Sequence, residues 1–153
     1  MHVTLSPGTA SYNGILSAMP MTASGATSAT IELVQPVSQG GFVDCGFAVE
    51  SETATRYGFG VGGGNLVTRI DSDQVVVAYN PTAHRHLRIR HDSGTVTLET
   101  SADRTTWTPQ RAAAVTPITQ ATVLIFAGAF AVGSPEPGEA IFDRFAWTAP
   151  DCP

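Results

Sequence analysis

Apolar and polar residues alternate with a period of two along most of this chain, a pattern typical of β-strands. Every second side chain of a strand faces the same side, so each segment can bury one face and hydrate the other. Short clusters of Gly, Asn, Asp and Ser separate the segments, as expected for the turns of an antiparallel meander. The pattern predicts strands over residues 28–34, 42–50, 56–61, 65–70, 74–79, 86–91 and 95–100.

Two later segments complete this pattern. Residues 122–132 are apolar on both faces, as expected in the middle of a packed sheet, and residues 139–147 follow after a Gly- and Pro-rich loop. The best helical candidate, residues 109–117, is short and bracketed by prolines. Roughly ten short strands with little helix predict an all-β fold, in which two antiparallel sheets pack as a β-sandwich or jelly roll.

Length and charge narrow the class of protein. With 153 residues the chain can bury one substantial core, and we expect a single domain over residues 1–153. A net charge of -5 with 8 Lys and Arg residues argues against nucleic acid as a partner, because phosphates require a concentrated basic surface. No apolar run reaches the ~18 residues of a membrane span. The opening residues lack the basic and apolar regions of a secretory signal, so we expect no signal peptide in this chain.

The two cysteines, Cys45 and Cys152, are too few for a disulfide framework. Cys45 alternates with Val43, Phe47 and Val49 on one side of a predicted strand. We therefore expect a buried thiol that packs as a small hydrophobic group, and a Cys45–Cys152 disulfide is the alternative.

The most polar candidate surface lies on the predicted strand over residues 86–91. Leu87 and Ile89 point to the core, so the side chains that alternate with them point outward. The neighbouring strand adds polar groups to the same outer face. The predicted ligand-binding residues are His84, His86, Arg88, Arg90 and Glu99, beside Thr97.

Two interpretations of this polar face are open. Guanidinium and imidazole donors could bind sugar hydroxyls or acidic groups. Alternatively, Arg and Glu pairs across neighbouring strands hold the sheet in register and contribute ~0.2–1 kcal/mol each. His84 and His86 have a spacing that can ligate zinc, but a zinc site needs three or four ligands and His91 points to the opposite face. We therefore expect no metal site there.

A second candidate surface has few side chains. In residues 57–65, Gly58 and Gly60 alternate with larger residues and lie beside Gly46 and Ala48 of the preceding strand. One face of the sheet is therefore bare, which could admit a ligand or another chain close to the backbone, or could reflect ordinary tight packing. The run is not a phosphate-binding loop, because no helix follows it and the Lys and Ser or Thr of such loops are missing.

Residues 99–109 form the clearest predicted turn, in which Ser101 and Asp103 can accept backbone N–H groups and Trp107 can cover the hairpin. The sequences HRHLRIRHDSGTVTLETSADRTTWT, VLIFAGAF and AIFDRF resemble the concanavalin A-like lectin/glucanase superfamily, specifically its laminin-G-like and beta-xylosidase C-terminal-type sandwiches. The resemblance covers about residues 80–147. Arg104 stands where that family usually has Gly, so a left-handed turn position would be strained there.

The resemblance carries further expectations. Phe142 and Phe145 are three residues apart, so both can face the core only through a bulge, whose freed amide Asp143 would satisfy. The glucanases of the superfamily carry an E-x-D-x-E strand that this chain lacks, and no nucleophile elbow occurs, so the resemblance implies that the chain is not an enzyme. It leaves calcium open as a ligand, with oxygen donors at Asp71, Asp73, Asp143 and Glu139.

Together these features favour a non-catalytic carbohydrate-binding or surface-recognition module of a larger secreted or virion protein, without a cofactor. Its partner would be a glycan or polysaccharide, and its location extracellular or virion-associated. The alternative is a structural or assembly domain of a phage or phage-like tail particle that contacts mainly other protein chains. A homo-oligomer is left open.

Overall fold

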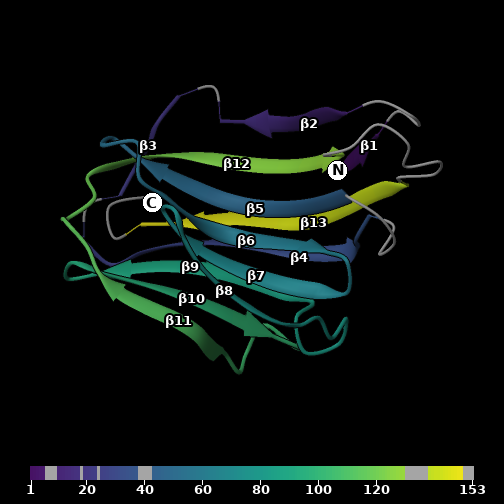
Figure 1. The fold of residues 1–153 in the computed structure, drawn as a ribbon. Helices are drawn as coiled ribbons and strands as arrows, with labels where there is room; N and C mark the ends of the chain where they lie inside the picture. The colour runs from purple at the N-terminus through teal and green to yellow at the C-terminus, as the bar shows by residue number, and fades with distance from the viewer. Residues whose placement is uncertain (6–9, 18, 24, 38–42, 130–137, 150–153) are drawn as a thin grey trace.

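A computed structural model describes residues 1–5, 10–17, 19–23, 25–37, 43–129 and 138–149. Two antiparallel sheets pack against each other, which confirms the predicted β-sandwich (Figure 1). The first sheet has the order β1 (His2–Thr4), β13 (Glu139–Thr148), β4 (Thr27–Gln35), β9 (His86–Asp92), β10 (Thr95–Ser101) and β11 (Thr108–Ala114). The second has the order β2 (Ser11–Leu16), β12 (Gln120–Ala129), β5 (Val43–Ser51), β6 (Arg56–Gly62), β7 (Asn65–Ile70) and β8 (Asp73–Ala78), and β3 (Met21–Thr22) also pairs with β12.

Alternating residues of both sheets build one core between them. The large side chains buried there include Phe47, Phe59, Phe142, Ile31, Leu66, Leu87 and Leu98. Because each strand directs every second residue into this core, its remaining residues form an outer face on each sheet. The side chains available for recognition therefore lie mainly on two outer faces and on the turns.

Most predicted strands are present, with small shifts at their ends. The ranges 28–34 and 42–50 correspond to β4 and β5, and the next five ranges correspond to β6–β10. Residues 42 and 130–132 of the predicted strands lie outside the described residues. The segment that contained the best helical candidate forms β11 instead, because pairing with β10 satisfies its backbone and outweighs a weak local helix preference.

The order of the strands departs from one continuous meander. The strands β5–β8 and β9–β11 are meanders, but β4 pairs with β9 and β13, and β12 pairs with β2 and β5. The chain thus passes from one sheet to the other after β1, β3, β4, β8, β11 and β12. This exchange lets the apolar faces of the two sheets bury each other.

The bulge expected near the end of the chain is present in β13. The pairing with β4 shifts register after Asp143, Arg144 has a φ of 52°, and Asp143 Oδ1 accepts the Arg144 N–H at 2.8 Å. Phe142 is buried in the core. Phe145 is 42% exposed and reaches the core through an edge contact with the ring of Phe47.

Cys45 is buried with a free thiol, and burial raises the pKa of that thiol to about 12. This agrees with the expectation of a small hydrophobic group, while Cys152 lies outside the described residues. No helix in the described part of the chain is long and apolar enough to cross a membrane.

Candidate functional site

The predicted polar residues of β9 lie on the outer face of the first sheet and pair with β10. Arg88 Nε lies 2.6 Å from Glu99 Oε2, and Arg90 Nε lies 3.5 Å from the same oxygen. The register places Arg88 opposite Glu99 and Arg90 opposite Thr97, so Thr97 and Glu99 share the outer face of the arginines, as predicted. His86 belongs to the same alternating set and is buried. We term His86, Arg88, Arg90 and Glu99 the arginine face.

A second group of ion pairs borders the arginine face on the side of β13. Glu32 of β4 is buried, and its carboxylate binds Arg85 at 2.6 Å and Arg144 at 3.3 Å. His86 lies opposite Glu32 in the register, and burial lowers the pKa of its imidazole. The two buried carboxylates of the first sheet, Glu32 and Glu99, are thus neutralised by arginines of the same chain.

The structure places His84 apart from the arginine face. It lies in the turn before β9, where its Nδ1 accepts the Asn80 N–H at 3.1 Å and its ring contacts Tyr79. The strand begins only at His86, so the alternation that was expected to align His84 with His86 does not extend to this position. Burial lowers the pKa of His84, and its observed contacts are structural.

The turn between β10 and β11 satisfies its own backbone groups. Ser101 Oγ accepts the Arg104 N–H at 2.9 Å, and Asp103 Oδ1 accepts the N–H groups of Thr105 and Thr106 at 2.8 Å. These donors hold the pKa of Asp103 well below its usual range. Arg104 has a φ of 65°, a left-handed conformation that glycine adopts without strain.

Trp107 covers one end of the arginine face. Its indole N–H donates to the Arg104 carbonyl at 3.1 Å, and the Arg88 guanidinium lies 4.1 Å from the ring centroid. Arg88 is therefore held between an aromatic ring and the Glu99 carboxylate. The observed contacts favour the interpretation of this face as a cross-strand ladder.

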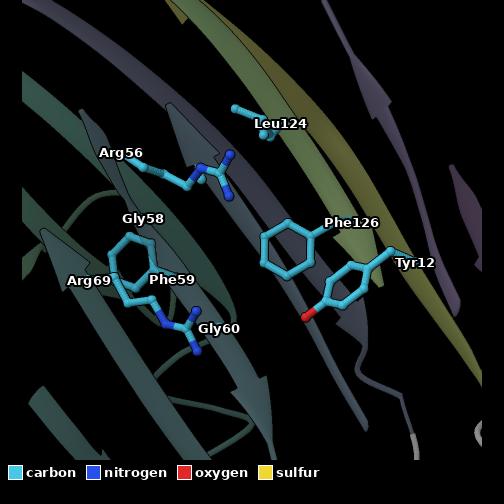
Figure 2. Close-up of a pocket in the computed structure, with 9 residues that line it drawn as sticks. Tyr12, Arg56, Gly58, Phe59, Gly60, Arg69, Leu124 and Phe126 are labelled. Atoms are coloured by element: carbon cyan, nitrogen blue, oxygen red, sulfur yellow. The ribbon is translucent and has the colours of Figure 1, made fainter. Parts of the chain in front are cut away.

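The outer face of the second sheet carries an open pocket of about 200 Å³ (Figure 2). A cavity of about 150 Å³ accommodates benzene, so this pocket has room for part of a ring-shaped ligand. We term it the glycine pocket. It is lined by Tyr12 of β2, Ala48 of β5, Arg56, Gly58, Phe59 and Gly60 of β6, Arg69 of β7, and Leu124 and Phe126 of β12.

Glycines allow two aromatic rings of this face to lie close to the backbone. Gly46 is opposite Phe126 in the register, and a Cβ atom at Gly46 would lie 2.5 Å from the Phe126 ring. Gly128 is likewise opposite Tyr12, and a Cβ atom there would also lie 2.5 Å from the ring. The centroids of the two rings are 6.1 Å apart. The glycines therefore have a packing role as well as forming a bare surface.

Gly60 differs from the other strand glycines, Gly14, Gly46, Gly58, Gly62 and Gly128, because it leaves open space. A Cβ atom at Gly60 would lie 3.7 Å from Asp44 Oδ2 and 4.0 Å from Val67, which are ordinary van der Waals distances. At Gly58, by contrast, an added Cβ would lie 2.6 Å from Ala48. A Cβ atom at position 60 would thus fit without displacing the walls of the pocket, which Gly60 lines.

Two arginines reach toward the aromatic side of the pocket (Figure 2). Arg56 is paired with Glu50, with Nη2 and Oε2 2.8 Å apart. Arg69 is exposed, and within the described residues its guanidinium acts on Asp44 through its charge without forming a hydrogen bond or ion pair. Its guanidinium is consequently available to a ligand, unlike those of Arg56 and Arg88.

Asp44 adds an acceptor beside the glycine pocket. Burial raises the pKa of its carboxyl to about 6, although Arg69 acts in the opposite direction. The Tyr12 hydroxyl lies 3.5 Å from Asp44 Oδ1, and burial together with Asp44 raises the pKa of Tyr12 to about 12. At neutral pH the site therefore presents the carboxylate of Asp44, the guanidinium of Arg69 and the neutral phenol of Tyr12 beside the apolar ring of Phe126.

The acidic residues considered as calcium ligands lie at separate places. Asp71 and Asp73 are at the turn between β7 and β8, where Arg111 binds Asp73. Asp143 belongs to the bulge of β13, and Glu139 pairs across to β1. The described residues contain no group of three or more His, Cys, Asp or Glu side chains that could hold a metal ion.

Sequence reasoning identified the floor of the glycine pocket but missed its walls. The alternating Gly58 and Gly60 indicated a bare face, whereas Tyr12, Arg69 and Phe126 had no local signal of function. They meet only because β2 and β12 pair on one side of β5 while β6 and β7 follow on the other.

No family model matches this chain, and neither does any curated protein. Among solved structures, a functionally unknown protein from Saccharomyces cerevisiae has a similar fold, with a TM-score of 0.61 and 20% identity over 90% of this chain and 73% of that one. The CBM2 module of the evolved Dit protein of Lactobacillus casei BL23 phage J-1 is also similar, with a TM-score of 0.54 and 9% identity over the same shares of the two chains. At these identities the likeness is one of fold.

Proposed function

We propose that this chain is a non-catalytic carbohydrate-binding module of the concanavalin A-like type, part of a secreted or virion protein, and that a glycan binds in the glycine pocket. The observation that carries the proposal is the composition of the pocket. Tyr12 and Phe126 lie over a glycine-rich surface, with the available guanidinium of Arg69 and the carboxylate of Asp44 beside them.

This combination matches the two kinds of surface that a sugar ring has. Its C–H face is apolar and can pack on an aromatic side chain, as Tyr12 offers with 55% of its surface exposed. Its hydroxyls both donate and accept hydrogen bonds, so they can pair with Asp44 and Arg69 respectively. A concave, mainly apolar site with a few convergent polar groups is the usual form of a small-ligand site.

The similarity in fold to the phage CBM2 module supports a carbohydrate-binding role, since that module is named as a carbohydrate-binding one. The arginine face is the second candidate site on the same molecule. The pocket is favoured because Arg69 is unpaired within the described chain, whereas Arg88 and Arg90 already share Glu99.

A glycan array followed by titration calorimetry tests the proposal. Gly60→Leu should weaken binding of the selected glycan at least about tenfold, or about 1.4 kcal/mol, because the new side chain fills the pocket. The melting temperature of the Gly60→Leu variant should not fall, because the added Cβ has room and because glycine weakens a strand interior. Gly60→Ala is the control for the backbone change and should weaken binding less.

A matched pair of arginine variants distinguishes the two sites. Arg69→Gln should weaken binding about as much as Gly60→Leu, while Arg90→Gln should bind like the unmodified protein. The opposite result, with Gly60→Leu binding normally and Arg90→Gln inactive, would place the ligand on the arginine face. Failure to bind any glycan on a broad array would refute the carbohydrate-binding function itself.

The second candidate function is an assembly domain of a phage or phage-like tail, favoured by the same similarity in fold to a module from a phage protein. Such a domain should form a stable complex with a protein partner and bury more than ~1,000 Å². Copurification of that partner, together with normal complex formation by Gly60→Leu, would support this function over glycan binding.

A further inference from the structure

The edge strand β8 is unusual in being exposed along its whole length. All six residues from Asp73 to Ala78 are exposed, including Val75, Val76 and Val77 at 45%, 54% and 39%. The strand pairs with β7 on one side and ends the sheet on the other. Edge strands are usually protected by Lys, Pro, a bulge or a covering loop, because their free backbone groups can pair with another strand. The sequence DQVVVA contains neither Lys nor Pro.

The register shows which backbone groups of β8 have no partner strand among the described residues. The two-residue turn makes Ile70 and Asp73 a hydrogen-bonded pair, and at the other end of β8 the Tyr79 N–H donates to the Gly64 carbonyl at 2.9 Å. Between these two pairs, hydrogen-bonded and non-hydrogen-bonded residue pairs alternate along the strands. Asp73, Val75 and Val77 therefore pair with β7. The N–H and C=O groups that point to the open edge belong to Gln74, Val76 and Ala78.

We propose that β8 pairs with β8 of a second copy of this chain, antiparallel and centred on Val76. In that register Gln74 faces Ala78 of the second copy and Val76 faces Val76, which forms about six backbone hydrogen bonds. The free groups are thus complementary to themselves about a two-fold axis, the commonest symmetry of homodimers.

Side-chain charge and polarity favour a second copy as the occupant. Asp73, the one acidic side chain of β8, is bound by Arg111 of β11 and in the dimer faces Tyr79 rather than another carboxylate. Val75 faces Val77 of the second copy, so exposed apolar side chains cover one another. A strand-edge contact of this length is small, so the dimer should be weak and dependent on concentration.

The dimer would also affect the proposed glycan binding. The two-fold axis stands perpendicular to the joined sheet, so the outer faces of both copies, and both glycine pockets, point in the same direction. Counting strands at ~4.8 Å spacing places the pockets roughly 25–35 Å apart. Two sites on one side can engage one glycan-bearing surface together, which raises the apparent affinity without new contacts.

Sedimentation velocity over about 1 µM to 1 mM tests the pairing. The unmodified chain should shift from monomer to dimer, and Val76→Lys should remain a monomer. Val34→Lys is the matched control, because it changes an exposed valine (50%) of the other sheet by the same charge, and it should still dimerise. The proposal would be overturned if the unmodified chain stays monomeric or if the Val76→Lys variant still dimerises. It would also be overturned if Val34→Lys abolishes the dimer as Val76→Lys does.

A second measurement does not depend on the folding of the lysine variant. With Cys152→Ser as background, Val76→Cys should form a disulfide-linked dimer under a mild oxidant, since facing Cα atoms ~5.5 Å apart allow the bond. Val34→Cys should not, and equal crosslinking of both would count against the pairing.

The consequence for glycan binding is tested separately. Val76→Lys should bind a monovalent glycan normally but a dense glycan surface more weakly. If the unmodified protein binds no glycan, the proposed function is refuted, but the sedimentation experiment still tests the pairing of β8 independently.

Discussion

Asp44 illustrates how one buried residue links recognition to stability. Its side chain lies beside the glycine pocket, and burial raises the pKa of the carboxyl from 3.8 to about 6. Between these two values the folded chain binds a proton that the unfolded chain releases. The group therefore reduces stability progressively as the pH rises from about 4 to about 6, and this cost is fully present above pH 6.

Asp44→Asn should remove this cost. We expect the variant to be more stable at pH 7.5 by about 1–2 kcal/mol, which is less than the full shift implies because local relaxation reduces the cost of a buried charge. The advantage should shrink toward zero near pH 4, where the native carboxyl is already protonated. Urea unfolding at several pH values measures the difference. Asp92→Asn, an exposed control on the other sheet, should show no such trend, and a difference independent of pH would contradict the explanation.

At the scale of elements, the β10–β11 hairpin combines good hydrogen bonding with a strained residue. Arg104 adopts a φ of 65°, which costs an L-residue roughly 1–2 kcal/mol. Arg104→Gly relieves this strain but increases the freedom of the unfolded chain, so the net gain should be about 0.5–1 kcal/mol. The Trp107 contact survives the change, because the indole donates to the backbone carbonyl of residue 104.

Thermal unfolding of two glycine variants tests this account of the hairpin. Arg104→Gly should melt a few degrees higher than the unmodified chain. Arg69→Gly, at a strand position without a positive φ, should melt lower because strand glycines are unfavourable. A lower melting temperature for Arg104→Gly would show that its side-chain contacts outweigh the backbone strain.

At the scale of the whole molecule, the first and last described strands are neighbours. Val3 of β1 lies opposite Ala140 of β13, the Met1 amino group donates to the Phe142 carbonyl at 2.6 Å, and Leu5 is buried. Pairing between distant parts of the chain is expected to make unfolding cooperative, as it is for most single domains. The expectation of one domain over residues 1–153 is a prediction that unfolding can test.

Leu5→Ala should destabilise the entire sandwich by about 2–5 kcal/mol. Far-ultraviolet circular dichroism reports on both sheets, and tryptophan fluorescence reports on Trp107 and Trp147. Both signals should follow one transition in the unmodified chain and shift together in the variant. Separate transitions would indicate more than one unit and contradict the single-domain prediction.

Local pattern was sufficient to predict β4–β10, β12 and β13, and the residues of these strands that face the core, but it did not predict β1–β3 or β11. The alternation around Leu87 and Ile89 correctly placed Arg88 and Arg90 on the outer face, because the period of two depends only on strand geometry. The bulge at Asp143 also followed from the spacing of Phe142 and Phe145, whereas the left-handed turn position at Arg104 was expected from the family resemblance.

The partners of those strands were decided by tertiary structure. Residues 109–117 became a strand through pairing with β10. His84 does not lie on the predicted face, because it belongs to the turn before β9 and the alternation begins only at His86. Tyr12 meets Phe126, and Arg69 reaches the same pocket, only through pairings between segments that are far apart in sequence. Such pairings depend on the packing of both sheets around the shared core, and a period of two is equally compatible with many strand orders.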